Sequence, residues 1–425
     1  MDTVINNSKA IKKTITIPGD KSISHRSVML GSLANGTTHV HGFLTGEDCL
    51  STIACFKKMG IEIELDGTDV TVHGKGLNGL KAPTETLDVG NSGTTLRLMT
   101  GILSAQPFSC TVTGDSSIQK RPMDRVEKPL KQMGAEITGH GGEKILAPLH
   151  ITGHSLKGTH YTLPVASAQV KSAIILAGLY AEGKTVITEP EATRDHTEIM
   201  LNHFGADIKR NGNDITVTPV KELYAKEIFV PGDISSAAYF MVLGAVCPDS
   251  DITIKNVGIN PTRTGIITVL ENMGANITLL NERTVSGEKV ADINVKYTPS
   301  LKSTTVEGDI IPKLIDEIPV IAVAACFAEG TTVIKDAQEL KVKESNRIKT
   351  VVNELKKFGA DIEETDDGMI IKGKCSLKGA VCDSHNDHRI AMSMAVAGIM
   401  AEGSTTIKDS QCVDISFPTF FSLLK

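Results

Sequence analysis

A short stretch near the start of the chain combines the residue types that hold anions. The sequence PGDKSISHRS, residues 18–27, places Lys21 and Arg26 among hydroxyl groups, just before the apolar segment VMLGSLA. Asp20 or Ser22 can cap a helix here, because their oxygens accept hydrogen bonds from free N–H groups. A helix N-terminus is already partly positive, so two added cations favour a bound anion. The stretch predicts a phosphate or carboxylate site, against the alternative of a solvated cap with surface charges.

The same kind of polar start before an apolar helix occurs six times along the chain. The six junctions are PGDKSISHR, GNSGTTLR, PVASAQVKS, PGDISSAAY, IDEIPVIAV and NDHRIAMS. If they face one another, their helix N-termini line one large chamber that attracts anions. The pattern therefore predicts a ligand with several negative charges.

These junctions belong to an internal repeat of roughly seventy residues. Its second marker is a helix, a tight turn and a strand, as in LANGTTHV and AEGKTVI. Its third is a helix that ends on a glycine before a strand, because glycine tolerates a left-handed C-cap. The five helix-ending glycines are Gly60, Gly134, Gly205, Gly274 and Gly359. Each unit reads strand, helix, strand, helix, strand, strand.

Six such units predict an α/β protein of two three-repeat domains, with helices bundled inside and sheets outside. The sixth unit ends early, at DISFPTFFSLLK, whereas the strand KKTITIP in residues 1–17 has no helix of its own. We therefore expect this strand to complete the C-terminal half. The N-terminal domain would span 20–229, and the C-terminal domain would join 1–19 with 230–425. The similar crossings TIPGDKS and FVPGDIS suit a hinge, with the active site in the cleft between the domains.

Composition excludes several classes of function. The net charge of −6, 4% aromatic content and absence of Trp argue against nucleic-acid binding. No apolar run approaches the roughly 20 residues of a membrane span, and the first residues lack the apolar core of a signal peptide. Eight cysteines without a CxxC pair suit reduced thiols. We expect a cytoplasmic globular protein without a membrane or nucleic-acid partner.

A metal site is the weaker interpretation of one Cys/His group. Cys375, Cys382, His385 and His388 loosely resemble a ligand set, but the six-residue gap between the cysteines is wider than common zinc spacings. We expect no metal here.

Three charged residues in the C-terminal half allow either catalytic or ordinary structural roles. Asp316, in IDEIP, could act as a base, but a carboxylate at a helix start is ordinarily a dipole partner. Glu344 and Arg347, in VKESNR, could be an i, i+3 pair on the solvated side of an amphipathic helix. The apolar face of that helix would consist of Ile348, Val351, Val352 and Leu355.

Eight motifs in order resemble the 5-enolpyruvylshikimate-3-phosphate synthase family over essentially the whole chain. They are PGDKSISHR, GNSGTTLRL, KRPM, ASAQVKSA, TRDHTE, DEIP, VKESNR and NDHRIAM. The resemblance, closest to the bacterial branch with SAQVKSA and TRDHTE, implies the enolpyruvyl transferase fold. This fold is a two-domain inside-out α/β barrel, in which each domain has three βαβαββ repeats with helices inside and sheets outside.

The resemblance implies transfer of the enolpyruvyl group of phosphoenolpyruvate to the 5-hydroxyl of shikimate 3-phosphate, with release of phosphate. The reaction proceeds by addition and elimination through a tetrahedral intermediate, in the shikimate pathway to chorismate and aromatic amino acids. It needs a base for the hydroxyl, a proton for the methylene carbon and cations for the anionic groups. The two substrates are the expected partners of a monomer, and no cofactor is implied.

The resemblance also implies the roles of individual residues. Asp316 would be the base, Glu344 would transfer the proton at the methylene carbon, and Lys21, which sits among arginines, would both hold an anion and carry a proton. The residues implied to bind shikimate 3-phosphate are Lys21, Ser22, Arg26, Ser167, Arg194, Asp316 and Lys343. Those implied to bind phosphoenolpyruvate are Lys21, Asn91, Gly93, Arg121, Gln169, Arg347 and Arg389.

Three positions bear on the details of this resemblance. Ala168 stands where many relatives have Ser, and Ile415 stands where some have a phosphoenolpyruvate-binding Lys. Arg347 and Arg389 would then carry more of that binding. Gly93 implies inhibition by glyphosate, a phosphoenolpyruvate competitor that a side chain there would crowd.

Two alternatives remain from the sequence. The sister family that acts on UDP-N-acetylglucosamine shares the repeats, but it has a reactive Cys five residues before the arginine that corresponds to Arg121, where this chain has Ser116. It also lacks the DKSISHR start. A noncatalytic receptor for phosphorylated metabolites is the other alternative, although such a receptor would bind anions better without Asp316 and Glu344.

Overall fold

The computed structural model describes residues 1–8, 10–142 and 144–424, which form two compact units. The N-terminal unit contains residues 19–230 and 285–288, and the C-terminal unit contains 1–18, 231–284 and 289–425. The chain passes between the units at Pro18–Gly19 and Val230–Pro231, and the short segment 285–288 returns to the N-terminal unit. No helix in the described ranges combines the length and the apolar character that a membrane crossing requires.

Three buried helices form the centre of the N-terminal unit. They are α1 (Lys21–Leu33), α3 (Gly93–Leu103) and α5 (Ala168–Gly178). Shorter elements accompany them: α2 (Glu47–Lys58), η1 (Ile118–Lys120), α4 (Asp124–Gln132) and α6 (His196–His203). Each central helix is buried around most of its surface, as expected of a helix with neighbours on every side.

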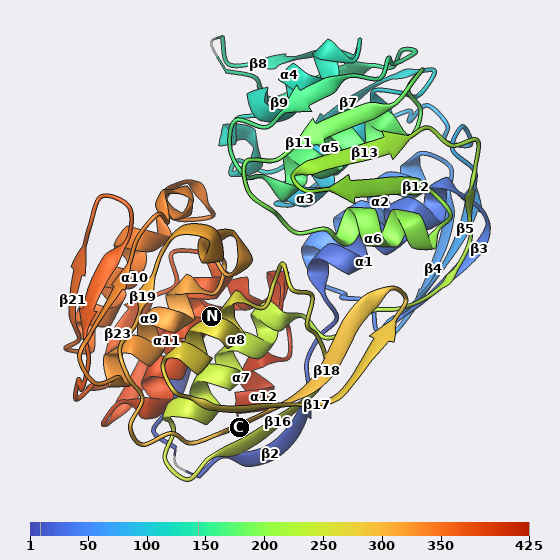
Figure 1. Cartoon of the computed structure of the whole chain (residues 1–425). Coiled ribbons are helices and arrows are strands. Elements are labelled where there is room, and N and C mark those ends of the chain that lie inside the picture. The colour runs from blue at the N-terminus through green and yellow to red at the C-terminus, as the bar shows by residue number, and fades with distance from the viewer. Residues whose placement is uncertain (9, 143, 425) are drawn as a thin grey trace. The chain divides into compact units, whose positions relative to one another are not determined.

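Three sheets cover these helices (Figure 1). The first has the order β14-β3-β5-β4 with β15 also beside β3, the second β6-β7-β9-β8 and the third β10-β11-β13-β12. The strands of the first sheet are β3 (Ala34–His41), β4 (Glu62–Asp66), β5 (Asp69–Lys75), β14 (Leu223–Tyr224) and β15 (Glu227–Phe229). The others are β6 (Leu87–Asp88), β7 (Ser109–Thr113), β8 (Glu136–His140), β9 (Leu146–Thr152), β10 (His160–Thr162), β11 (Thr185–Thr188), β12 (Asp207–Asn211) and β13 (Asp214–Thr218).

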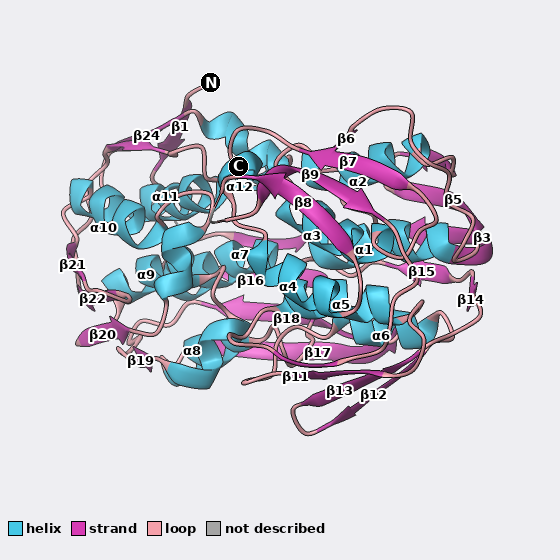
Figure 2. Ribbon diagram, turned by 90° about the horizontal axis from the view of Figure 1, so that it is seen from above, coloured by secondary structure: helices cyan, strands magenta, loops and turns pink. Residues whose placement is uncertain are grey.

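The C-terminal unit repeats this plan around α7 (Ile234–Val246), α9 (Ile318–Phe327) and α11 (His388–Met400). Its other helices are α8 (Gly265–Asn272), η2 (Gly308–Lys313), η3 (Gln338–Val342), α10 (Arg347–Lys357), η4 (Ser410–Ile415) and α12 (Phe420–Leu424). Figure 2 distinguishes these helices from the strands around them.

Three sheets also surround the C-terminal helices, in the orders β17-β18-β16-β2, β19-β20-β22-β21 and β1-β24-β23. Their strands are β1 (Thr3–Asn6), β2 (Lys12–Thr16), β16 (Asp251–Gly258), β17 (Asn276–Val285), β18 (Glu288–Lys296), β19 (Thr305–Val306), β20 (Thr331–Ile334), β21 (Asp361–Glu364), β22 (Met369–Lys372), β23 (Val381–Asp383) and β24 (Ser404–Lys408). The six sheets of the described chain and their buried helices confirm the predicted fold class and repeat.

The position of the N-terminal strands corrects one detail of the repeat. The strand KKTIT, β2, was expected to complete the sixth unit, but it pairs in parallel with β16 of the fourth. The preceding segment TVIN, β1, pairs antiparallel with β24 and completes the sixth sheet instead. The predicted half is therefore correct and the predicted sheet is wrong. The sequence did not indicate β1 as a separate strand, because it has only four residues and a weak alternation.

The five helix-ending glycines have the predicted left-handed conformation. Their φ values range from +81° at Gly274 to +103° at Gly134. An added Cβ at Gly274 would meet no atom within 4 Å, so its backbone conformation alone requires glycine there.

We expect Gly274→Ala to lower the free energy of unfolding by about 1 kcal/mol, because an L-residue is strained at this φ. Thermal unfolding measures the change as a lower Tm. Glu271→Ala, at an exposed position of the same helix, is the control and should change stability by less than about 0.5 kcal/mol. An unchanged Tm for Gly274→Ala would contradict the assignment of strain.

Candidate active site

The first candidate residues lie at the N-terminus of α1. Asp20, rather than Ser22, is the N-cap, and its Oδ1 accepts a hydrogen bond from the Ile23 N–H at 2.9 Å. Lys21 Nζ lies 3.0 Å from Asp48 Oδ2, at the start of α2. From the sequence, Lys21 was expected to have only arginines as neighbours, so Asp48 is an addition to the predicted site.

Arg26, one turn further along α1, is buried and held by three oxygens. Its Nε donates to Thr197 Oγ1 at 2.7 Å, its Nη2 to Ser172 Oγ at 3.0 Å and its Nη1 to the Ser22 carbonyl at 2.9 Å. Burial and the charge of Arg194 together lower the pKa of Arg26 to about 10, against the opposing effect of nearby carboxylates. A bound phosphate would compensate two cations that the protein leaves close together.

A buried lysine fixes the segment that carries Thr197 and Arg194. Lys171, in α5, has no exposed side-chain surface, and its Nζ lies 2.7 Å from Glu198 Oε1 and 3.2 Å from Glu189 Oε2. Burial raises the pKa of Glu198, although Lys171 opposes this shift. Because an unpaired buried charge is costly, the Lys171 ammonium holds both ends of the 189–198 segment against α5.

The starts of α3 and α5 are joined through side chains. Ser92 and Ser167 are the N-caps of the two helices, and Arg97 Nη1, one turn into α3, donates to Gln169 Oε1 at 2.7 Å. Gln169 Nε2 donates to Thr94 Oγ1 at 2.9 Å. These hydrogen bonds fix the orientation of the Gln169 amide beside Gly93.

Gly93 leaves space for two guanidinium groups. A Cβ at this position would lie 2.7 Å from Arg97 Nη1 and 3.2 Å from Arg121 Nη1. Arg121 Nη2 donates to Asn91 Oδ1 at 3.5 Å, and Asn91 Nδ2 donates to Asp115 Oδ2 at 2.7 Å. The arrangement presents two cations and a free helix start to an anion.

The second group of candidate residues surrounds Arg347 in the C-terminal unit. Only 1% of the Arg347 side chain is exposed. Its Nε and Nη2 donate to the two oxygens of Asp387, at 2.8 and 3.2 Å. The remaining contacts are with Glu344 Oε2, 2.5 Å from Nη2, and Asp316 Oδ1, 3.2 Å from Nη1. One guanidinium therefore aligns three carboxylates.

This geometry excludes the solvated i, i+3 pair considered from the sequence. The helix α10 begins at Arg347, with Asn346 as its N-cap, so Glu344 precedes the helix. Burial alone would lower the pKa of Arg347, but the carboxylates of Asp387, Glu344 and Asp316 outweigh burial and raise it. Arg347 is therefore cationic throughout the physiological range.

Two more cations lie close to the Asp316 carboxylate. Lys343 Nζ is 3.6 Å from Asp316 Oδ1. Arg389, at the start of α11, has a raised pKa, because Asp316 and other anionic groups outweigh its burial. Its Nη1 lies 4.0 Å from Glu317 Oε1. Asp316 and Glu317, just before α9, therefore each face a cation from elsewhere in the unit: Lys343 lies near Asp316, and Arg389 lies near Glu317.

The candidates thus form two groups, each within its own unit. The N-terminal group contains Lys21, Ser22, Arg26, Asn91, Gly93, Arg121, Ser167, Gln169 and Arg194. The C-terminal group contains Asp316, Lys343, Glu344, Arg347 and Arg389. Two residues differ from those that many or some relatives have at the same positions. Ala168 is the first residue of α5, and Ile415 is partly buried against the C-terminal core.

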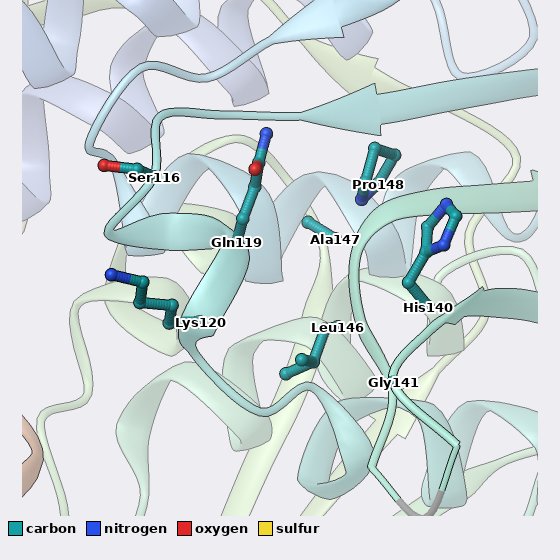
Figure 3. A pocket seen from close by; sticks show the side chains of 8 residues that line it. All are labelled: Ser116, Gln119, Lys120, His140, Gly141, Leu146, Ala147 and Pro148. Carbon is teal, nitrogen blue, oxygen red and sulfur yellow. The ribbon is translucent and has the colours of Figure 1, made fainter.

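Two other features lie apart from these groups. The residues Cys375, Cys382, His385 and His388 are not among the described residues whose potential ligand atoms lie together, so the weak metal pattern has no structural counterpart. A separate surface cavity of about 460 Å³ (Figure 3) lies between the β8–β9 hairpin and residues 116–120, which precede Arg121. None of the predicted site residues lines it.

Several residues of the two groups were not predicted. Asp48 and Arg97 each follow a predicted junction in the repeat, Lys171 interrupts an otherwise apolar helix, and Asp387 immediately precedes His388 in NDHR. A buried charge in an apolar segment is the signal that could have indicated Lys171. The pairings of Asp48 and Asp387 depend on segments distant in sequence.

Comparison with known proteins identifies the family. The family model of EPSP synthase (3-phosphoshikimate 1-carboxyvinyltransferase) matches residues 5–424. A 3-phosphoshikimate 1-carboxyvinyltransferase of Thermoanaerobacter sp. (strain X514) is 58% identical over 421 residues, covering 99% of each chain. One of Bacillus cereus (strain B4264) is 59% identical over 423 residues, covering 99% of this chain and 97% of the relative.

A solved structure agrees with this result. The EPSP synthase of Acinetobacter baumannii superposes with a TM-score of 0.90 at 50% identity, covering 99% of this chain and 97% of that one. The match extends over both units. The chain belongs to the EPSP synthase family and is a transferase.

Proposed function

We propose that this transferase moves the enolpyruvyl group of phosphoenolpyruvate to the 5-hydroxyl of shikimate 3-phosphate and releases phosphate, and that both groups of residues serve this one reaction. The family match supports this step of the shikimate pathway, which supplies chorismate and aromatic amino acids, and does not favour the UDP-N-acetylglucosamine alternative. The observation that carries the proposal is the alignment of Asp316 and Glu344 by the buried Arg347.

The alignment supports separate roles for the two carboxylates. In the addition step, Asp316 accepts the proton of the 5-hydroxyl while the hydroxyl oxygen forms a bond to C2 of phosphoenolpyruvate. Glu344, which enters this step protonated, donates its proton to the methylene carbon. In the elimination step, the bond from C2 to the phosphate oxygen breaks and Glu344 takes a proton back from the methyl group. Lys21 donates a proton to the departing phosphate, and the proton that Asp316 took up returns through water to Lys21, so that all three groups recover their starting protonation states.

The cations of both groups then hold the substrates. One set of residues suits shikimate 3-phosphate, because a buried guanidinium and hydroxyl groups favour a phosphate. This set contains Arg26, Lys21, Ser22, Ser167, Arg194 and Lys343. A second set suits the carboxylate and phosphate of phosphoenolpyruvate. It contains Arg121, Asn91, Gly93, Gln169, Arg347 and Arg389. Charge stabilisation of this kind is ordinarily among the largest contributions to catalysis.

The proposal includes a cytoplasmic monomer in which residues 20–229 form one domain and residues 1–19 and 230–425 the other. Eight free cysteines suit a reducing compartment. The acidic net charge argues against nucleic acid as a partner.

Phosphate release with alternative acceptors tests the proposed reaction. The purified chain should release phosphate from phosphoenolpyruvate in the presence of shikimate 3-phosphate and not with UDP-N-acetylglucosamine. Release with the sugar nucleotide alone would assign the chain to the sister activity. No release with either acceptor would favour a receptor.

Asp316→Asn should lower kcat by about 10²–10⁴-fold, because the amide cannot accept the hydroxyl proton. The affinity for shikimate 3-phosphate, measured by calorimetry, should change far less. The matched control is Asp309→Asn, at an exposed position of the same unit, and should leave kcat unchanged. If Asp316→Asn retains more than a tenth of kcat, Asp316 is not the base.

Gly93→Ala should raise KM for phosphoenolpyruvate and weaken inhibition by glyphosate, because its Cβ displaces Arg97 and Arg121. Initial rates at varied phosphoenolpyruvate and glyphosate measure both effects. Gly258→Ala is the matched control, since its Cβ would meet its nearest neighbour at an ordinary 3.4 Å. Equal inhibition of the Gly93→Ala and unaltered enzymes would contradict this role of Gly93.

A further inference from the structure

Two cysteines outside the candidate site lie where the backbone makes an unusually close approach. The end of α9 contains Cys326, and the segment that follows β22 contains Cys375. The Cys375 N–H donates to the Cys326 carbonyl at 2.8 Å, and the Gly373 N–H donates to the Gly330 carbonyl at 2.9 Å. A Cβ at Gly373 would meet the Ala328 carbonyl oxygen at 1.8 Å. Main-chain contacts therefore fix the relative position of the two cysteines.

This backbone geometry permits a disulfide bond. Hydrogen-bonded residues of paired segments have Cα atoms about 5.5 Å apart, within the range of about 4.4–6.8 Å that disulfides span. An ion pair between Lys374 Nζ and Glu329 Oε1, 2.8 Å apart, joins the same two segments. A bond between the sulfurs would thus require little backbone movement.

The two thiols have unlike environments that suit unequal roles. Cys326 is fully buried, whereas Cys375 is partly exposed. A hydrogen bond from the Cys326 thiol lowers the pKa of Cys375 to about 6, with a further contribution from the Asp361 main-chain N–H, against burial and the Asp361 carboxylate. The same bond, together with burial, raises the pKa of Cys326. The accessible Cys375 sulfur therefore ionises more readily than the buried Cys326 sulfur. In their protonated forms, Cys375 donates to the Lys372 carbonyl at 3.0 Å and Cys326 donates to the Ala322 carbonyl at 3.3 Å.

We propose that Cys375 and Cys326 form an oxidative modification site at which a hydroperoxide produces an intramolecular disulfide. The Cys375 thiolate attacks the peroxide; an S–O bond forms, the O–O bond breaks, and the leaving hydroxide takes a proton to become water. The Cys326 sulfur then attacks the sulfenic acid; the S–S bond forms and the S–O bond breaks. The second hydroxide leaves with the Cys326 proton as water. Two thiols and one hydrogen peroxide give one disulfide and two waters.

The bond would close a loop from 326 to 375 that contains β20, α10, β21 and β22. This loop carries Lys343, Glu344 and Arg347, so the disulfide restricts the unfolding of the repeat that bears them. Cys326 lies at the end of α9 remote from Asp316, about 15 Å along a ten-residue helix. The expected effect is higher thermal stability with little change in kcat. The proposal does not depend on the identity of the substrates.

Peptide mapping of the full chain tests the site. The reduced protein is treated with equimolar hydrogen peroxide, its remaining thiols are alkylated in denaturant, and its digest is examined by mass spectrometry. We expect the Cys326 and Cys375 peptides to be joined, with a loss of two hydrogens, while the other six cysteines are alkylated. Recovery of Cys375 as the alkylated or sulfinic form without a linked peptide would overturn the proposal, as would equal oxidation of all eight cysteines.

Variants distinguish the sulfur that attacks the peroxide from the sulfur that then attacks the sulfenic acid. In Cys326→Ser, the sulfenic acid of Cys375 should persist and be trapped by dimedone, whereas Cys375→Ser should give neither the adduct nor the linked peptide. Cys110→Ser is the matched control, because burial raises the pKa of Cys110 to about 11, and it should form the linked peptide as the unaltered chain does. Failure of dimedone to label Cys326→Ser would contradict Cys375 as the attacking sulfur.

Thermal unfolding gives a second readout that does not require folded variants. Peroxide treatment should raise the Tm of the unaltered protein by several degrees, and dithiothreitol should reverse the change. An unchanged or lower Tm in the presence of the linked peptide would contradict the stabilising role.

Discussion

The burial of the Arg347 guanidinium is the constraint on which the C-terminal group of candidate residues depends. A cation removed from water requires compensating charge and hydrogen bonds, and Asp387, Glu344 and Asp316 supply them from three separate segments. Removing Arg347 would leave three carboxylates in mutual repulsion. The same ion pairs that compensate the buried charge therefore fix the orientations of Asp316 and Glu344, to which we assign the proposed proton transfers.

The N-terminal unit solves a related problem with a buried ammonium group in place of the guanidinium. The buried Lys171 ammonium lies between Glu189 and Glu198 and fixes the segment that carries Thr197. Thr197 in turn accepts a hydrogen bond from Arg26, whose burial disfavours its own charge. Ion pairs within the protein thus position a guanidinium whose own hydrogen-bond partners are neutral oxygens, an arrangement that suits a bound phosphate.

The repeat explains why helix starts carry the chemistry. In each unit, three buried helices pack together inside sheets, so their N-terminal N–H groups and caps lie at one kind of position in every repeat. The helix-ending glycines confirm the register of the repeat, since all five have positive φ. The placement of β1 and β2 could not be read in the same way, because two short strands compete for adjacent sheet edges and only pairing selects between them.

The sequence by itself determined the α/β class, the six repeats, the helix starts and the motifs that identify the family, because all of these are written in local periodicity, turn residues and short motifs. Only the tertiary structure decided that Arg347 is buried rather than solvated, that Asp48 pairs with Lys21, and that Asp387 completes the guanidinium site. These outcomes depend on contacts between segments distant in the chain. Burial and the pairing of charges are properties of such contacts, and no local pattern encodes them.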